Sequence, residues 1–337
     1  MTLRQLRALQ EVVKQGLRIS AAAEALHTSQ PGVSRQILEL EQELGVSIFV
    51  RKRGRLVSVT DAGEALLTVA ERMLGDAASL RTIASDYSSK DTGQLSIATT
   101  HTHACYTLPR VIQQFSAAYP RVQLSLREGT PAQCCEIVAT AGADVAITTQ
   151  TSEVFESLAT LPAYRLARCL ILPVRHPLLK EKNLTLDKIA RYPLITYDST
   201  FSSRRSVDRA FAARGLTPNI VLRAIDADVS KKYVALGLGV AILPTITYDA
   251  RLDKSLRTLD VDHLFDQGLV NVCLRKGSYI REFIYAFITM FAPHLTRRVV
   301  SRSLASDAPA ITPAHEVPIA DFSEKRKSRR RPRRTSR

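Results

Sequence analysis

Two short amphipathic helical patterns, joined by a tight turn and followed by a basic loop, occupy residues 19–55 of this 337-residue chain. The first pattern places four apolar residues on one helical face: Ile19, Ala22, Ala23 and Leu26. The second pattern does so with Val33, Ile37, Leu40 and Leu44. A third helical pattern lies upstream, at Leu3, Leu6, Leu9 and Val13. Together they predict a small three-helix core.

The turn before the second helix carries good start signals. Thr28 or Ser29 can cap the helix, and Pro31 suits its first turn, where no amide donor is needed. In a helix-turn-helix, this second helix enters the major groove of DNA through its N-terminal residues. The candidate DNA contacts are Thr28, Ser29, Gln30, Pro31, Ser34 and Arg35.

A basic loop follows, in which Gly54 permits a tight turn between two short apolar strands around Phe49 and Val57. Cations at a hairpin tip suit phosphate contact and insertion into the minor groove. The candidates are Arg51, Lys52, Arg53 and Arg55. The sequence therefore predicts a winged helix-turn-helix that binds double-stranded DNA. The alternatives are an ordinary helical hairpin for the two helices and a solvated turn for the basic loop.

A long helical pattern begins after Thr60, which is placed as its cap. Its apolar residues alternate in steps of four and three: Leu66, Ala70, Met73, Ala77, Leu80, Ala84 and Tyr87. Such a heptad seam predicts a helix that pairs with a second copy, which suits a protein that reads two half-sites. Packing onto its own domain is the alternative. Residues 88–93 are expected to form a hinge.

From Gln94 onward, short apolar strands alternate with helical segments, which is typical of a parallel sheet. The strands are predicted within residues 94–100, 122–129, 143–149, 166–174, 192–197, 219–225, 240–244 and 269–276, with helices between most of them. Two α/β lobes fit this pattern, the last strand and helix returning to the first lobe. Small ligands bind in a cleft at the carboxyl ends of such strands.

The composition of the chain bears on its cellular compartment and on where its positive charge lies. No apolar run approaches the roughly 20 residues that span a bilayer, and the N-terminal residues lack a signal-peptide pattern, so we expect a cytoplasmic protein. The net charge of +15 falls to +6 without the nine Lys and Arg of residues 325–337. That tail is expected to be disordered and either to strengthen sequence-independent DNA binding or to be inert.

The odd number of five cysteines argues against a disulfide framework, and the vicinal Cys134 and Cys135 are expected to be buried or idle thiols rather than redox sensors.

In its order of elements the chain resembles the LysR-type transcriptional regulators over residues 1–296. Phrases such as LHTSQPGVSRQILELEQELGVSIFVR and AIDADVSKKYVALGLGVAILP resemble the branch formed by CysB and Cbl. The resemblance implies an α/β protein with an N-terminal winged helix-turn-helix, a linker helix and a two-lobed effector domain like a periplasmic binding protein. The expected domains are residues 1–59 for DNA binding, 60–92 for the linker helix, 93–296 for the effector and 297–337 for the basic tail. Lobe I would take residues 93–162 and 269–296, and lobe II residues 163–268.

The same resemblance implies an activator of sulfur-assimilation and cysteine-biosynthesis genes that binds a small anionic effector, such as acetylserine or sulfate. It also implies a homotetramer and adds RNA polymerase as a candidate partner, with no cofactor. Carried over by position, the effector residues are Thr100, Thr102, Thr149 and Ser202. Thr130 and Gln133 open a helix beside the same cleft. His103, which stands where the branch usually has Gln, could supply a cation below its ordinary pKa of about 6.5.

Other functions stay open. One alternative is a regulator of sulfonate or sulfate-ester utilisation genes, and another is a LysR regulator with a different ligand. A metal sensor is imaginable because His101, His103 and Cys105 alternate, but the strand is expected to turn into a helix near Thr100, so these side chains would diverge. An enzyme is not expected, since His103 and Cys105 form the one nucleophile pair worth considering and no acid accompanies them.

Overall fold

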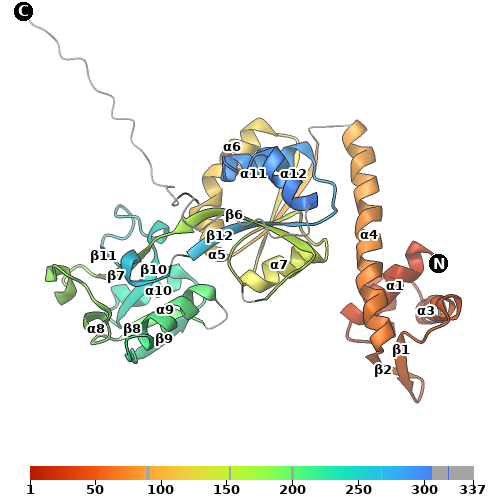
Figure 1. Ribbon diagram of the computed structural model, residues 1–337, viewed down its shortest axis with the longest axis horizontal. Coiled ribbons are helices and arrows are strands. Elements are labelled where there is room, and N and C mark those ends of the chain that lie inside the picture. The colour runs from red at the N-terminus through yellow and green to blue at the C-terminus, as the bar shows by residue number, and fades with distance from the viewer. Residues whose placement is uncertain (89–91, 152, 199–200, 267, 306–317, 319–337) are drawn as a thin grey trace, which may run out of the picture. The chain divides into compact units, whose positions relative to one another are not determined.

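The computed structural model describes residues 1–88, 92–151, 153–198, 201–266, 268–305 and 318 (Figure 1). These residues fall into two compact units, the first made of residues 1–88 with 277–281 and the second of the described residues between 92 and 276 and from 282 onward. The basic tail at residues 325–337 lies outside the described residues. Within the described ranges, no helix combines the length and the apolar character that crossing a membrane requires.

The N-terminal unit is a helical core with a β-hairpin. Its elements are α1 (Leu3–Lys14), α2 (Ile19–Ala25), α3 (Gln30–Leu44), β1 (Phe49–Lys52), β2 (Arg55–Val59) and α4 (Asp61–Ser88). Leu9, Ala22 and Ile37 are buried together, which confirms the predicted three-helix core. In three places the apolar face differs from the prediction. Leu3 is exposed, Val12 is fully buried whereas Val13 only packs half-buried against the core, and Glu41 is buried whereas Leu44 is exposed.

The starts of α3 and α4 are set by side-chain caps. Ser29 rather than Thr28 caps α3, because its Oγ accepts a hydrogen bond from the Gly32 amide at 3.2 Å. Thr60 Oγ1 accepts from the Gly63 amide at 3.0 Å in the same way. A Cβ at Gly63 would lie 2.3 Å from the Ile48 carbonyl oxygen, so a glycine lets α4 begin close against the strand.

The long helix α4 uses its two halves differently. Leu66, Ala70 and Met73 pack onto the core of their own unit, as the alternative interpretation predicted. Leu80, farther along the same seam, is 69% exposed. The Tyr87 side chain lies outside those described. The N-terminal half of α4 therefore packs onto the core of its own unit. Pairing of the C-terminal half with a second copy of the chain stays a prediction.

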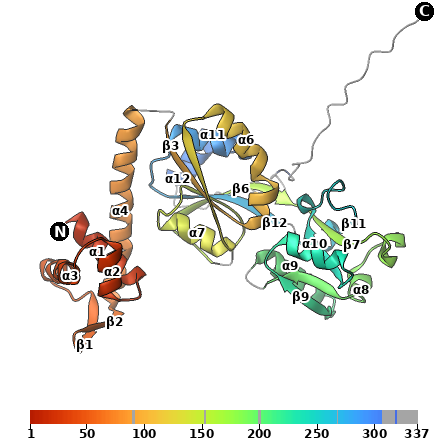
Figure 2. The same ribbon diagram turned by 180° about the vertical axis from the view of Figure 1, so that it is seen from behind.

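The second unit contains two five-stranded sheets, the first of which forms lobe I (Figure 2). Its strand order is β4-β3-β5-β12-β6. The strands are β3 (Gly93–Thr99), β4 (Val122–Glu128), β5 (Val145–Thr149), β6 (Leu158–Leu166) and β12 (Gly268–Arg275). The helices are α5 (His101–Tyr106), α6 (Leu108–Ala118), α7 (Pro131–Ala139), α11 (Glu282–Phe291) and α12 (Arg297–Ala305). In both views α7 covers one face of this sheet, and α6 and α11 cover the other.

Lobe II is built on the second sheet, with the order β11-β7-β10-β8-β9. Its strands are β7 (Arg168–Pro173), β8 (Leu194–Tyr197), β9 (Ile220–Ala224), β10 (Val240–Pro244) and β11 (Leu256–Asp260). Its helices are α8 (Leu186–Ile189), α9 (Ser202–Ala212) and α10 (Ala227–Ala235), with 3-10 turns at Pro177–Lys180, Thr245–Thr247 and Asp262–Leu264.

Both sheets are mixed, whereas the strand–helix alternation indicated parallel pairing. β3, β4 and β5 are parallel, but β12 runs antiparallel to β5 and β6. In lobe II, β7 runs antiparallel to β10 and β11. The reason is the crossing between lobes: β6 passes into β7 through the single residue Ala167, and β12 returns to the first sheet as predicted. The strands β6 and β11 were not predicted from the sequence.

Candidate effector cavity and DNA-binding surface

A cavity of about 370 Å³ lies at the carboxyl ends of the parallel strands. Strands from both sheets end at it, since Thr100 follows β3, Thr149 ends β5, Tyr197 ends β8 and Pro244 ends β10. This is where open α/β sheets bind ligands. The remaining lining residues are Thr102, His103, Gln150, Thr151, Leu166, Arg168, Phe201, Ser203, Arg205, Ser206, Arg209, Asp266, Gly268 and Leu269.

The structure brings four of the seven predicted effector residues together in this cavity: Thr100, Thr102, His103 and Thr149. Thr130 and Gln133 do not line it. They form a capping box at the start of α7, in which the Thr130 amide donates to Gln133 Oε1 at 2.9 Å and the Gln133 amide donates to Thr130 Oγ1 at 3.3 Å. Their polar groups are thus used within the helix start. Ser202 begins α9, but its side chain is outside those described.

Two buried polar atoms of the cavity lining have no hydrogen-bond partner among the described residues: His103 Nε2 and the Tyr197 hydroxyl. His103 Nδ1 lies 3.3 Å from the Tyr164 hydroxyl, and the buried Tyr197 hydroxyl interacts with the Thr102 side chain without a hydrogen bond of normal length. A buried polar group without a partner costs about 1–3 kcal/mol. One group comes from each lobe, so a ligand that accepts hydrogen bonds would satisfy both.

His103 is not the cation that the sequence suggested. Complete burial lowers the pKa of His103 to about 4, so its imidazole is neutral at neutral pH. Positive charge in the cavity comes instead from Arg168, Arg205 and Arg209, against the one carboxylate of Asp266 among the lining residues. Arg209 lies 3.2 Å from Asp266, which leaves an excess of positive charge for an anionic ligand.

Arg168 stands at the crossing between the lobes. Its backbone amide donates to Asp262 Oδ1 at 3.0 Å, its guanidinium donates to the Asp266 carbonyl, and it stacks over the Phe265 ring. These contacts join the segment that passes from lobe I to lobe II at Ala167 to the segment before β12 that returns to lobe I, beside the cavity.

The sequence interpretation did not predict Tyr197 or the three arginines. The i, i+4 spacing of Arg205 and Arg209 on one predicted helix was the available signal.

The start of α3 presents the predicted base-contacting residues. Thr28, Ser29, Gln30, Pro31 and Arg35 are exposed, and Ser34 is half-buried. Arg35 is paired with Glu39 at 2.7 Å, although its side chain remains 82% exposed. An exposed polar helix start of this kind can reach base edges, so the arrangement suits the predicted role of α3.

The wing is a two-residue hairpin with Arg53 and Gly54 at its tip, at φ values of +50° and +77°. Lys52, Arg53 and Arg55 are exposed there. Arg51 differs from them, because its guanidinium donates to both oxygens of Glu41, at 3.1 and 2.7 Å. This two-point contact gives Arg51 a structural task between wing and helix.

Glu41 holds the wing strand against α3. Its Oε1 also accepts hydrogen bonds from the amides of Ile48 at 2.8 Å and Phe49 at 3.2 Å. Burial by itself would raise the pKa of Glu41, but the hydrogen bonds from Arg51, Ile48 and Phe49 outweigh it and lower that pKa. The carboxylate is therefore charged, buried and fully partnered.

Two family models match the chain. The lysR-family bacterial regulatory helix-turn-helix matches residues 3–64, and the LysR substrate binding domain matches residues 88–296. The chain belongs to the LysR family of transcriptional regulators. This confirms the predicted fold class and the prediction of a DNA-binding regulator rather than an enzyme.

Named relatives extend over most of this LysR regulator. It is 44% identical to the HTH-type transcriptional regulator CysB of Burkholderia cenocepacia, over 91% of this chain and 98% of that one. It is also 44% identical to the regulator SsuR of the same organism, over 89% and 98%. The regulator cbl of Escherichia coli is 39% identical over 90% and 96%. The predicted CysB/Cbl branch is therefore confirmed.

Solved structures agree with the fold. The cofactor-binding domain of the Cbl transcriptional regulator superposes with a TM-score of 0.61 at 37% identity, covering 63% of this chain and 93% of that one. A full-length OxyR variant from Pseudomonas aeruginosa gives a TM-score of 0.64 at 22% identity, covering 87% and 97%. The second likeness extends the fold to both units.

Proposed function

We propose that this LysR-type regulator activates sulfur-assimilation and cysteine-biosynthesis genes in response to a small anionic sulfur-linked effector, such as acetylserine or sulfate. The similarity to CysB and Cbl supports the pathway. The cavity between the lobes supports the ligand class. The protein acts in the cytoplasm as a homotetramer on promoter DNA, with RNA polymerase as its partner in activation.

The observation that carries this proposal is the pair of buried, unpartnered groups in a positively charged cavity. An oxyanion would accept hydrogen bonds from His103 Nε2 and from the Tyr197 hydroxyl, and Thr100 and Thr102 line the same cavity. Arg205 would supply charge-assisted contact. A ligand of this kind removes the cost of two unsatisfied polar groups, so the cavity favours an anion over an apolar ligand.

Control of transcription requires the effector to bind one arrangement of the lobes more tightly than another. A ligand with equal affinity for both arrangements shifts nothing, however tightly it binds. Because the lining residues come from both sheets, an anion in the cavity contacts both lobes at once and favours the arrangement in which they are close. The Arg168 contacts at the crossing lie beside that ligand.

A second candidate function is supported by the relative SsuR, which is as similar as CysB at 44% identity. In that case the regulated genes would serve the use of sulfonates or sulfate esters. A sulfonate presents the same three-oxygen anionic face as sulfate, with an organic group on the fourth position. The same cavity would then hold a larger ligand with the same donors.

A thermal-shift panel on the full-length protein tests the proposal. It compares sulfate, thiosulfate, adenosine phosphosulfate, O-acetylserine, N-acetylserine and an aliphatic sulfonate, with aromatic acids as controls. We expect a saturable rise in melting temperature with at least one sulfur-linked ligand. The shift should be reduced in Thr100→Ala and Arg205→Gln and retained in Arg175→Gln, an exposed arginine that does not line the cavity.

The panel also separates the two candidates. A shift with acetylserine or sulfate alone supports cysteine-biosynthesis control, whereas a shift that is largest with the sulfonate supports the second candidate. A shift only with aromatic acids would contradict both candidates.

A further inference from the structure

The short helix α5 presents two different faces. His103 points into the buried side, whereas His101 and Cys105, four residues apart, share the exposed side. The prediction that these three side chains diverge is therefore correct for His103 but wrong for His101 and Cys105, which lie together. His101 Nε2 and Cys105 Sγ lie 3.4 Å apart. Of the chain's five cysteines, all of them described, Cys105 is exposed and the other four are buried.

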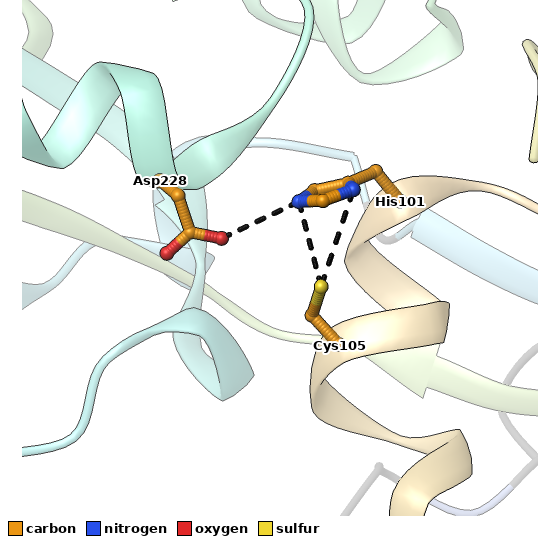
Figure 3. Close-up of side chains that lie close together, drawn as sticks. All are labelled: His101, Cys105 and Asp228. Carbon is orange, nitrogen blue, oxygen red and sulfur yellow. Dashed lines mark hydrogen bonds and ion pairs between the residues drawn. The ribbon is translucent and has the colours of Figure 1, made fainter.

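A third side chain reaches this pair from the other lobe. Asp228, in the first turn of α10, lies with Oδ2 3.5 Å from His101 Nε2 (Figure 3). The donor atoms of His101, Cys105 and Asp228 all lie within 4.8 Å of one another. An imidazole nitrogen, a thiolate and a carboxylate are the three ligand types that zinc takes in proteins.

The atoms that do not face the cluster are already held by neighbours. His101 Nδ1 bonds Glu128 Oε2 at 2.9 Å, which directs Nε2 at Cys105 and Asp228. Asp228 Oδ1 accepts from the Tyr106 hydroxyl at 2.5 Å and lies 3.4 Å from Lys231 Nζ, so Oδ2 is the oxygen left toward His101. A carboxylate behind a ligating histidine is the usual outer support of a zinc site.

The spacing also suits zinc. Zinc at about 2.3 Å from sulfur and about 2.0–2.1 Å from nitrogen and oxygen places tetrahedral ligands about 3.3–3.6 Å apart. The separations of 3.4 Å and 3.5 Å from His101 Nε2 match this range. We propose that His101 Nε2, Cys105 Sγ and Asp228 Oδ2 form a zinc site that joins lobe I to lobe II, with water completing the four positions.

Zinc at this site would tie α5 to α10 beside the effector cavity. The same helix α5 carries Thr102 and His103 on the cavity side, so metal and effector act on one element. A plain ion pair of His101 with Glu128 and Asp228 would not involve the sulfur of Cys105.

The test uses full-length protein freed of metal by a chelator and titrated with Co²⁺, then Zn²⁺, in the absence of any effector. We expect one equivalent of Co²⁺ per chain, a thiolate-to-cobalt charge-transfer band and its loss on adding Zn²⁺. Zn²⁺ should also slow the reaction of Cys105 with Ellman's reagent. Cys105→Ser should abolish the band, and His263→Gln, an exposed histidine outside the cluster, should leave it unchanged.

Glu128 gives a second, graded test as a positioning residue. Glu128→Ala should weaken cobalt binding about 10–100-fold, and Glu128→Gln, which keeps an acceptor for His101 Nδ1, should recover part of the loss. Cobalt binding without a thiolate band, or equal affinity in Cys105→Ser, would overturn the proposal. Because no effector is present, this result is independent of the effector experiment.

Discussion

Glu41 in the DNA-binding unit and the cavity-lining groups of the effector unit are all buried and polar, but they differ in whether the protein supplies their hydrogen-bond partners. Glu41 in the first unit receives hydrogen bonds from Arg51, Ile48 and Phe49. In the second unit, His103 Nε2 and the Tyr197 hydroxyl have no partner among the described residues. A fully partnered buried group stabilises the fold. An unpartnered one beside a cavity indicates that a ligand completes it.

The contrast predicts opposite responses to truncation. Removing Glu41 should damage the fold, because it leaves partners behind without a substitute. Removing a polar atom from the cavity lining should leave the unliganded fold intact and weaken the binding of the ligand. The following variants separate the two cases.

The largest effect is expected for Glu41→Ala. The change leaves the amides of Ile48 and Phe49 and the half-exposed Arg51 without their acceptor, so the N-terminal unit should lose about 2–3 kcal/mol of unfolding free energy. Hydrogen exchange of the slowest amides of α1 and α3 in the full chain measures this loss. Glu24→Ala, an exposed acid on α2, is the control. Exchange that is equally slow in Glu41→Ala would contradict the structural role.

A smaller effect is expected at the wing, where two neighbouring arginines should differ. Arg53→Gln at the exposed tip should weaken binding to all DNA sequences several-fold and reduce the slope of log affinity against log salt by about one. Arg51→Gln should instead lower the stability of the N-terminal unit, because Glu41 loses its cation. Fluorescence anisotropy across a salt series and a thermal melt distinguish them. The same salt slope change in both variants would show that Arg51 contacts phosphate.

The smallest effect is the pH dependence of the same carboxylate. The pKa of Glu41 in the folded protein lies below its ordinary value of 4.5 despite its burial, because of its hydrogen bonds. Its contribution to stability is therefore full above the unfolded pKa and is lost as pH falls through the folded pKa. Circular dichroism melts between about pH 3 and 6 should show a shallower acid-side fall for Glu41→Gln than for the native chain. Parallel curves would contradict this contribution.

How much could be predicted from the sequence differs between the two units for a physical reason. Val33 and Ile37 were predicted as core because the helical period is a local signal. Thr100 and Thr149 were assigned to the cavity by position from the resemblance to the CysB and Cbl branch, and their place at strand ends agrees with that assignment. Tyr197 and Arg205 were not, since facing lobe I depends on how the chain crosses at Ala167.

The same limit explains why the partners of Glu41 and His101 could not be predicted from the sequence. A helical pattern shows which residues share a face, but not that a wing arginine ten positions away returns to Glu41. It likewise shows the i, i+4 relation of His101 and Cys105, but not that Asp228 reaches them from another lobe. Partners distant in sequence are therefore where the prediction fails.

The central claim is that the buried donors of the cavity bind the effector, and Tyr197→Phe tests it most directly. The change removes a hydroxyl that has no hydrogen bond of normal length to the described residues and a weaker interaction with the Thr102 side chain, which also lines the cavity. Calorimetric titration with the ligand found in the panel should show about tenfold weaker binding than the native chain, with an unchanged or higher melting temperature without ligand. Tyr233→Phe, an exposed tyrosine on α10, should bind as the native chain does. Equal affinity in Tyr197→Phe, or a lower melting temperature without ligand, would contradict the account.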